Sequence, residues 1–162
     1  MRGALTPSGL QVTILFSDIA GFTSIAERTE PNTLLYMLSD YFTAMATIIE
    51  DLGGTLLEFI GDAILAIWNA PAKCPTHAIN GVEASVRMQE QLNALVPTWR
   101  RKGYPTFTIR VGIHTDTVWV GNLGAPDRMK YGIMGDGVNF ASRLEELNKR
   151  YANTAGKSGR WH

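Results

Sequence analysis

The sequence contains a single cysteine, Cys74, among 162 residues. One cysteine cannot form a disulfide within the chain, which is the pattern expected in a reducing compartment. Because 15 Lys and Arg balance 15 Asp and Glu, there is no excess positive charge of the kind that binds nucleic acid through its phosphates. The apolar runs are too short to cross a membrane, and residues 1–9 lack the pattern of a signal peptide. We therefore expect a soluble, cytoplasmic chain without a nucleic-acid partner or a membrane segment.

Several familiar catalytic patterns are also missing. The histidines His77, His114 and His162 lack the spacing of a zinc site, so we expect packing or surface roles for them. Residues 156–158 read Gly-Lys-Ser, like the end of a P-loop, but Tyr151 stands where the first glycine of that motif belongs. We interpret this match as a coincidence. The length suits one domain with a full core.

The most informative stretch surrounds an isolated acid, Asp62. Residues 55–60 and 63–68 are two apolar segments rich in strand-forming residues, and Gly61-Asp62 joins them. Two residues with glycine first predict a tight β-hairpin turn. Asp62 is therefore expected at a rim and not in a core.

A second isolated acid lies upstream. Residues 12–17 form an apolar, β-branched segment that ends at Asp18, and the small-residue turn 19–23 follows it. Two strand-end carboxylates beside a turn with free backbone amides would suit a divalent cation that carries a polyphosphate. Solvated turn residues are the alternative interpretation of the same pattern.

Two long helices are predicted. The first follows Thr29 as the cap and Pro31 in the first turn, and Gly53-Gly54 ends it. Its apolar positions recur at helical spacing: Leu34, Leu35, Leu38, Phe42, Met45, Ile49 and Leu52. The second runs over about 77–100, with its apolar face at Val82, Val86, Leu92 and Leu95.

The remaining elements define the fold class. Strands are expected at 107–114 and 117–123, joined as a hairpin, then a short strand at 130–134 and a helix over about 138–151. Tight connections force antiparallel pairing, which excludes a doubly wound parallel sheet. We expect an α+β fold with a ferredoxin-like centre, in which helices pack on an antiparallel or mixed sheet.

Three motifs together resemble the catalytic domain of the class III nucleotidyl cyclases, the adenylyl and guanylyl cyclases. They read FSDIAGFT at 16–23, EFIGDA at 58–63 and YGIMGDGVNFASR at 131–143. The resemblance implies the same α+β fold and a catalytic domain over 11–151, after an N-terminal extension at 1–10. Residues 152–162 match nothing in the family, so we expect a flexible tail and a domain that is incomplete at its C-terminus.

The resemblance also implies the chemistry. Asp18, Asp62 and the Ile19 carbonyl would bind two Mg²⁺ or Mn²⁺ ions per site, while the turn Ala20, Gly21, Phe22 and Thr23 would bind the phosphates of a nucleoside triphosphate. Asn139 would orient the ribose and Arg143 would neutralise the α-phosphoryl group. These two residues lie four apart on one helix face, which by itself would fit an ordinary surface pair.

In the family the active sites are shared by a head-to-tail homodimer. One subunit supplies the aspartates, and the other supplies Glu58, Gly132, Asn139 and Arg143. Regulatory domains would lie elsewhere in the parent protein, which could be attached to a membrane.

The choice of base is expected to depend on Glu58 and Gly132. Adenylyl cyclases usually carry lysine at the first position and guanylyl cyclases carry glutamate, which can accept hydrogen bonds from the N1–H and N2–H₂ groups of guanine. Gly132 lacks the carboxylate that usually meets adenine, yet it offers no donor to the guanine O6. A purely structural explanation is also open for Gly132, in which another backbone passes close to this strand residue. Three hypotheses follow: a guanylyl cyclase, an adenylyl or mixed-substrate cyclase, and a catalytically silent nucleotide-binding or dimerisation module.

Overall fold

The structure is a computed structural model that describes residues 8–155, with side chains described for residues 8–147. Its five strands form one sheet in the order β2-β3-β1-β4-β5, and every neighbouring pair is antiparallel. The α+β prediction is confirmed. In chain order the elements are β1 (Ser8–Ile19), α1 (Phe22–Arg28), α2 (Pro31–Asp51), β2 (Thr55–Ile60), β3 (Ala63–Trp68), α3 (His77–Lys102), β4 (Ile109–Ala125), β5 (Arg128–Met134) and α4 (Asp136–Ala155).

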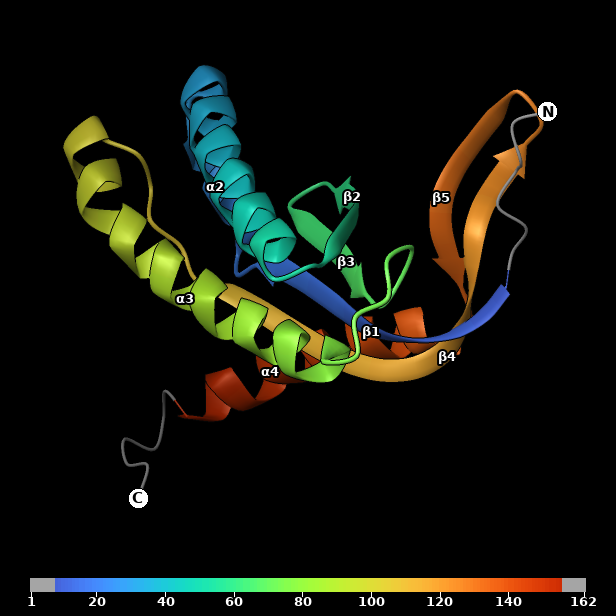
Figure 1. The fold of residues 1–162 in the computed structure, drawn as a ribbon. Coiled ribbons are helices and arrows are strands. Elements are labelled where there is room, and N and C mark those ends of the chain that lie inside the picture. The colour runs from blue at the N-terminus through green and yellow to red at the C-terminus, as the bar shows by residue number, and fades with distance from the viewer. Residues whose placement is uncertain (1–7, 156–162) are drawn as a thin grey trace.

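Helices cover the sheet on both faces. α2 and α3 pack together over one face, and α4 lies across the other (Figure 1). β3 is buried along its whole length because its alternate residues enter two different cores. Ile64 and Trp68 pack with α2 and α3, whereas Leu65 and Ile67 pack in the core that contains Ala141 of α4.

The predicted hairpin around Asp62 is confirmed. β2 and β3 pair directly across Gly61-Asp62, and Gly61 has a φ of 61°. A positive φ at the first central residue favours glycine there, because side chains strain that conformation.

The N-cap of the first long helix lies one residue after the predicted one. Glu30, not Thr29, is the N-cap, because the Glu30 carboxylate accepts a hydrogen bond from the Thr33 amide at 2.9 Å. Pro31 occupies the first turn as expected. The buried stripe is Met37, Tyr41, Met45 and Ile49, whereas Leu35 is 65% exposed.

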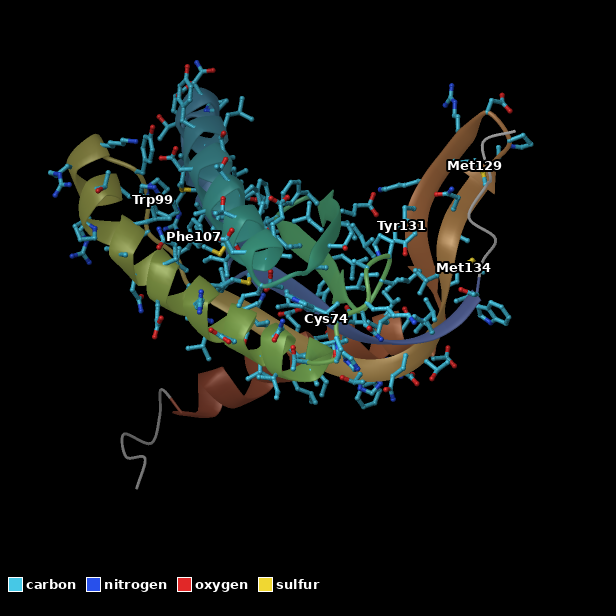
Figure 2. All side chains as sticks on the ribbon, viewed as in Figure 1. Cys74, Trp99, Phe107, Met129, Tyr131 and Met134 are labelled. Atoms are coloured by element: carbon cyan, nitrogen blue, oxygen red, sulfur yellow. The ribbon has the colours of Figure 1, made fainter. Side chains whose placement is uncertain are left out.

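The predicted apolar face of α3 is confirmed at Leu92 and Leu95, which pack in or against the core, and is wrong at the two valines. Val82 and Val86 are exposed, and the buried positions are Gly81, Ala84, Met88, Leu92 and Trp99. Small residues turn inward because the helix lies close to β1: a Cβ on Gly81 would lie 2.8 Å from Thr13 Cγ2. Near the end of α3, Trp99 packs against Phe107 with ring centroids 5.2 Å apart (Figure 2).

A single strand, β4, replaces the predicted hairpin of 107–114 and 117–123. Its polar centre looks like a turn, but Thr115 and Asp116 remain extended because they pair with Thr13 and Val12 of β1. β4 then continues beyond β1 and pairs with β5, so the second hairpin is β4–β5. No helix in the described part of the chain is long and apolar enough to span a membrane.

The ends of the predicted domain also differ. β1 begins at Ser8, within the segment expected to be an extension, and α4 runs to Ala155, past the predicted end near Tyr151. Residues 1–7 and 156–162, including the Gly-Lys-Ser sequence and His162, lie outside the described residues.

α4 approaches β4 most closely at Gly112. A Cβ there would lie 2.2 Å from the Ala141 carbonyl oxygen and 2.6 Å from the Glu145 amide nitrogen. The absent side chain therefore lets the helix rest directly on the strand.

We expect Gly112→Ala to lower the free energy of unfolding by about 1–3 kcal/mol, since overpacking forces the backbone apart. Gly9→Ala is the matched control, because a Cβ on that strand glycine would meet only Thr117 Cγ2 at 4.0 Å. Urea unfolding measures both variants. Equal midpoints for the two would contradict the close approach.

Candidate functional site

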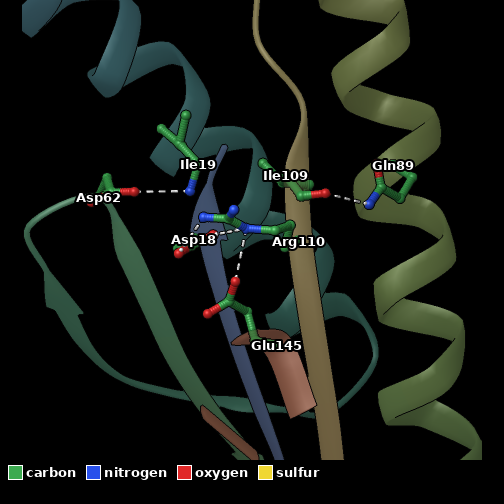
Figure 3. A network of polar contacts seen from close by, with 7 residues as sticks. All are labelled: Asp18, Ile19, Asp62, Gln89, Ile109, Arg110 and Glu145. Carbon is green, nitrogen blue, oxygen red and sulfur yellow. Dashed lines mark hydrogen bonds and ion pairs between the residues drawn. The ribbon is translucent and has the colours of Figure 1, made fainter. Parts of the chain in front are cut away.

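The two isolated aspartates lie next to each other in the structure. Asp62 Oδ2, in the β2–β3 turn, accepts a hydrogen bond of 2.8 Å from the Ile19 amide at the end of β1 (Figure 3). This contact connects the turn to the strand end that carries Asp18. Asp18, Ile19 and Asp62, which are distant in sequence, are thus brought together.

Asp18 forms an ion pair that the sequence analysis missed. Arg110 lies opposite Asp18 in the β1–β4 ladder, and its Nε and Nη2 donate to Asp18 Oδ1 and Oδ2, each at 2.9 Å. Arg110 Nε also lies 2.9 Å from Glu145 Oε1 of α4 (Figure 3). One guanidinium therefore lies between two carboxylates.

This cluster is largely shielded from water. The side chains of Arg110, Asp18 and Glu145 are 14%, 23% and 7% exposed. Burial, together with the neighbouring Asp18 carboxylate, raises the pKa of Glu145 to about 7 against the opposing effect of Arg110. The hydrogen bond to Asp18 raises the pKa of Arg110, so the guanidinium stays charged.

The phosphate turn is smaller than the sequence predicted. The Ala20 amide donates to the Thr108 carbonyl at 2.9 Å, so it has an acceptor already. Gly21 adopts a φ of 67° and α1 begins at Phe22. The first amides of a helix have no acceptor within it, so Phe22 and Thr23, next to Gly21, remain candidates for binding an anion.

Glu58 and Gly132 line the same hollow. This cleft, of about 310 Å³, lies between the β2–β3 and β4–β5 hairpins, and Tyr131 also lines it (Figure 2). Lys130 Nζ of β5 reaches across to Glu58 Oε1 at 2.5 Å. Sequence reasoning overlooked Lys130, although alternation along a strand places residues 130 and 132 on one face.

Asn139 and Arg143 lie apart from the aspartates. Both are exposed on α4, while Ala141 and Glu145 of the same helix face the sheet. Among the contacts found for the described residues, none joins Asn139 or Arg143 to Asp18 or Asp62. These side chains are free to meet a second molecule.

The donor set fits a hard divalent cation in part. Carboxylate oxygens are the ligands that Mg²⁺ prefers, and Asp62 Oδ1 has no protein hydrogen-bond donor within the described residues. Asp18, however, is already paired with Arg110. No cluster of three or more His, Cys, Asp or Glu ligands occurs in residues whose side chains are described, so a bound ion would need oxygens from the backbone or from a substrate.

The two described histidines have structural contacts. His77 Nδ1 lies 2.7 Å from the hydroxyl of the buried Thr13. His114 packs against Phe140 with ring centroids 4.4 Å apart. Both contacts agree with the expected packing roles.

Comparison with known proteins points to one family. Residues 6–151 match the adenylate and guanylate cyclase catalytic domain. Adenylate cyclase 1 of Rhizobium meliloti (strain 1021) is 41% identical over 149 residues, which are 92% of this chain and 22% of that protein. The chain thus spans about a fifth of the length of this relative.

Solved structures give the same result. The guanylyl cyclase Cya2 superposes with a TM-score of 0.83 at 37% identity, covering 87% of this chain and 72% of that one. The adenylyl cyclase CyaB from P. aeruginosa superposes with a TM-score of 0.84 at 36% identity, covering 88% and 74%. Overall similarity therefore does not distinguish the two substrate classes.

The raised pKa of Glu145 predicts a pH dependence of stability. A carboxyl whose pKa is higher in the folded state contributes its full stability below its ordinary pKa, and this contribution is lost as the pH rises through the folded value of about 7. Since one pKa unit corresponds to about 1.4 kcal/mol, the wild type should lose on the order of 1–3 kcal/mol relative to Glu145→Gln between about pH 5 and about pH 8.

Urea unfolding at the two pH values measures this difference. Glu146→Gln is the matched control, because its exposed neighbouring carboxylate faces solvent. A constant difference between wild type and Glu145→Gln would show that the buried carboxyl does not ionise in this range.

Proposed function

This chain belongs to the family of adenylate and guanylate cyclase catalytic domains, and on that premise we propose that it converts GTP to 3′,5′-cyclic GMP and pyrophosphate. The ribose 3′-oxygen attacks the α-phosphorus in line, the bond to the β-phosphate oxygen breaks, and the 3′-hydroxyl loses its proton. The observation that favours GTP over ATP is the Glu58–Lys130 pair in the cleft, which would contact the guanine base.

Asp18 and Asp62 are the residues that would hold Mg²⁺ or Mn²⁺, with the Ile19 carbonyl as a further ligand. Bound divalent ions supply Lewis-acid chemistry, which lowers the pKa of the 3′-hydroxyl and neutralises the triphosphate. The contact between Asp62 and the Ile19 amide supports this role, because it holds the two carboxylates at one edge of the sheet. The amides of Gly21, Phe22 and Thr23 then orient the phosphates.

Asn139 and Arg143 act on the nucleotide of a partner subunit. Asn139 orients the ribose, and Arg143 neutralises charge on the α-phosphoryl group, as arginines do in other phosphoryl-transfer enzymes. Their exposure on α4, away from the aspartates of their own chain, supports a head-to-tail homodimer. The monomer would then be inactive.

The cleft matches the edge of guanine. The Glu58 carboxylate accepts from N1–H and N2–H₂, while the Lys130 ammonium donates to O6, the donor that Gly132 cannot supply. Adenine presents an acceptor at N1 and a donor at N6, so neither group of the pair would be satisfied. A polar group that a bound base covers without satisfying costs about 1–3 kcal/mol, which corresponds to a preference of about ten-fold or more.

ATP is the competing substrate. Adenylate cyclase 1 of Rhizobium meliloti is named for that activity, and the overall similarity to the structures named adenylyl and guanylyl cyclase is nearly equal. Preferential turnover of ATP would move the assignment to that class. A chain without turnover of either nucleotide would be a silent binding or dimerisation module.

Asp62→Asn should abolish cyclic-nucleotide formation, with a loss of about a hundred-fold or more, because a metal-binding carboxylate contributes several kcal/mol to the transition state. The matched control is Asp127→Asn, which changes the exposed aspartate in the β4–β5 turn. Pyrophosphate release is measured with Mn²⁺ and with Mg²⁺ over a range of protein concentrations. Activity of the wild type that rises more steeply than linearly supports the dimer, whereas full activity of Asp62→Asn would contradict the metal assignment.

Glu58→Gln and Lys130→Met should each lower kcat/KM for GTP by about ten-fold and reduce the ratio of GTP to ATP turnover, because each removes one side of the base contact. Lys102→Gln is the control, since it breaks a comparable surface pair with Asp40 at 3.2 Å. An unchanged ratio in both cleft variants would reject the proposed contact with the base.

A further inference from the structure

Arg110 is shared unequally by two carboxylates. Asp18 takes two hydrogen bonds from it, through both carboxylate oxygens, and Glu145 lies within 2.9 Å of Nε alone. With both Asp18 oxygens engaged, the proposed metal ligand carries its own counterion. A divalent cation that binds Asp18 would lie close to the guanidinium and be repelled by it, so cation binding favours a shift of Arg110 away from Asp18.

Glu145 is well placed to receive the guanidinium. Its side chain is 7% exposed, and its backbone rests on Gly112 of β4, two residues from Arg110. Ala141, one turn earlier, is fully buried in the same contact. The carboxylate is therefore held in position by the close approach of α4 to the strand, and Arg110 need only shift its hydrogen bonds to reach it fully.

We propose that Glu145 is a positioning residue that takes the Arg110 guanidinium from Asp18 when Asp18 binds a divalent cation. This inference rests on the metal assignment of the proposed function. Glu145 itself does not ligate the ion. It stabilises the metal-bound arrangement by keeping the displaced arginine paired, since a buried charge without a partner is costly.

The test is to measure Mn²⁺ binding in the absence of nucleotide. The readout is the decrease in the EPR signal of the free ion. Glu145→Gln should weaken Mn²⁺ binding by about ten-fold or more, because a hydrogen bond to a charged group is lost in the metal-bound state only. Glu145→Asp keeps the charge but withdraws the carboxylate by one methylene, so it should not restore the affinity. Glu146→Gln should bind Mn²⁺ as the wild type does.

Measurements in the Arg110→Gln background distinguish a positioning role of Glu145 from a direct effect of its charge. Without the arginine Asp18 is free, so Mn²⁺ binding should tighten, and adding Glu145→Gln should then have little effect. Equal weakening by Glu145→Gln in both backgrounds would mean that Glu145 acts as a ligand or as a bare charge, which overturns the proposal. Thermal unfolding checks that each variant folds. If Arg110→Gln does not fold, the test is the comparison of Glu145→Asp with the wild type. Mn²⁺ affinity of Glu145→Asp equal to that of the wild type would contradict the positioning role of Glu145.

The outcomes also distinguish failure of the Glu145 role from failure of the metal assignment. If the wild type binds Mn²⁺ and Glu145→Gln binds it equally well, the role of Glu145 is rejected while the metal assignment stands. If the wild type and Arg110→Gln both fail to bind Mn²⁺, the metal assignment and the inference fail together.

Discussion

The ladder between β1 and β4 is the constraint on which the rest of the site depends. It places Asp18 opposite Arg110 and leaves the end of β1 beside the β2–β3 turn, where Asp62 bonds to the Ile19 amide. α2 and α3 pack on one face of the sheet, and α4 packs on the other. A catalytic constellation built on strand ends and a tight turn is more precise than one built on long loops.

Two hairpins form the cleft that the proposed function assigns to the base. β2–β3 carries Glu58, β4–β5 carries Lys130 and Gly132, and the pair across the cleft connects them. In the proposed function this pair would contact the base, with a hydrogen-bonding pattern that suits guanine and not adenine. Specificity would thus reside in a few polar atoms and not in the overall fold, which is nearly equally similar to structures named guanylyl and adenylyl cyclase.

Local features of the fold could be predicted from the sequence, and long-range pairs could not. The Gly61-Asp62 hairpin is encoded within a dozen residues, and so is the first turn at Pro31. By contrast, the polar centre of β4 is extended because of its ladder with β1, and the faces of α3 follow from contact with Thr13. Arg110 stood at a polar position of an alternating strand, but its partners, Asp18 and Glu145, come from other elements.

The ion pair between Asp18 and Arg110 has a consequence for how the domain is built. Proteins that cluster carboxylates around an ion often need that ion to offset mutual repulsion before they fold. Here the arginine supplies the balancing charge from within the chain. If the proposed metal assignment holds, folding would not depend on the cation, so the domain could fold before a metal–nucleotide complex binds.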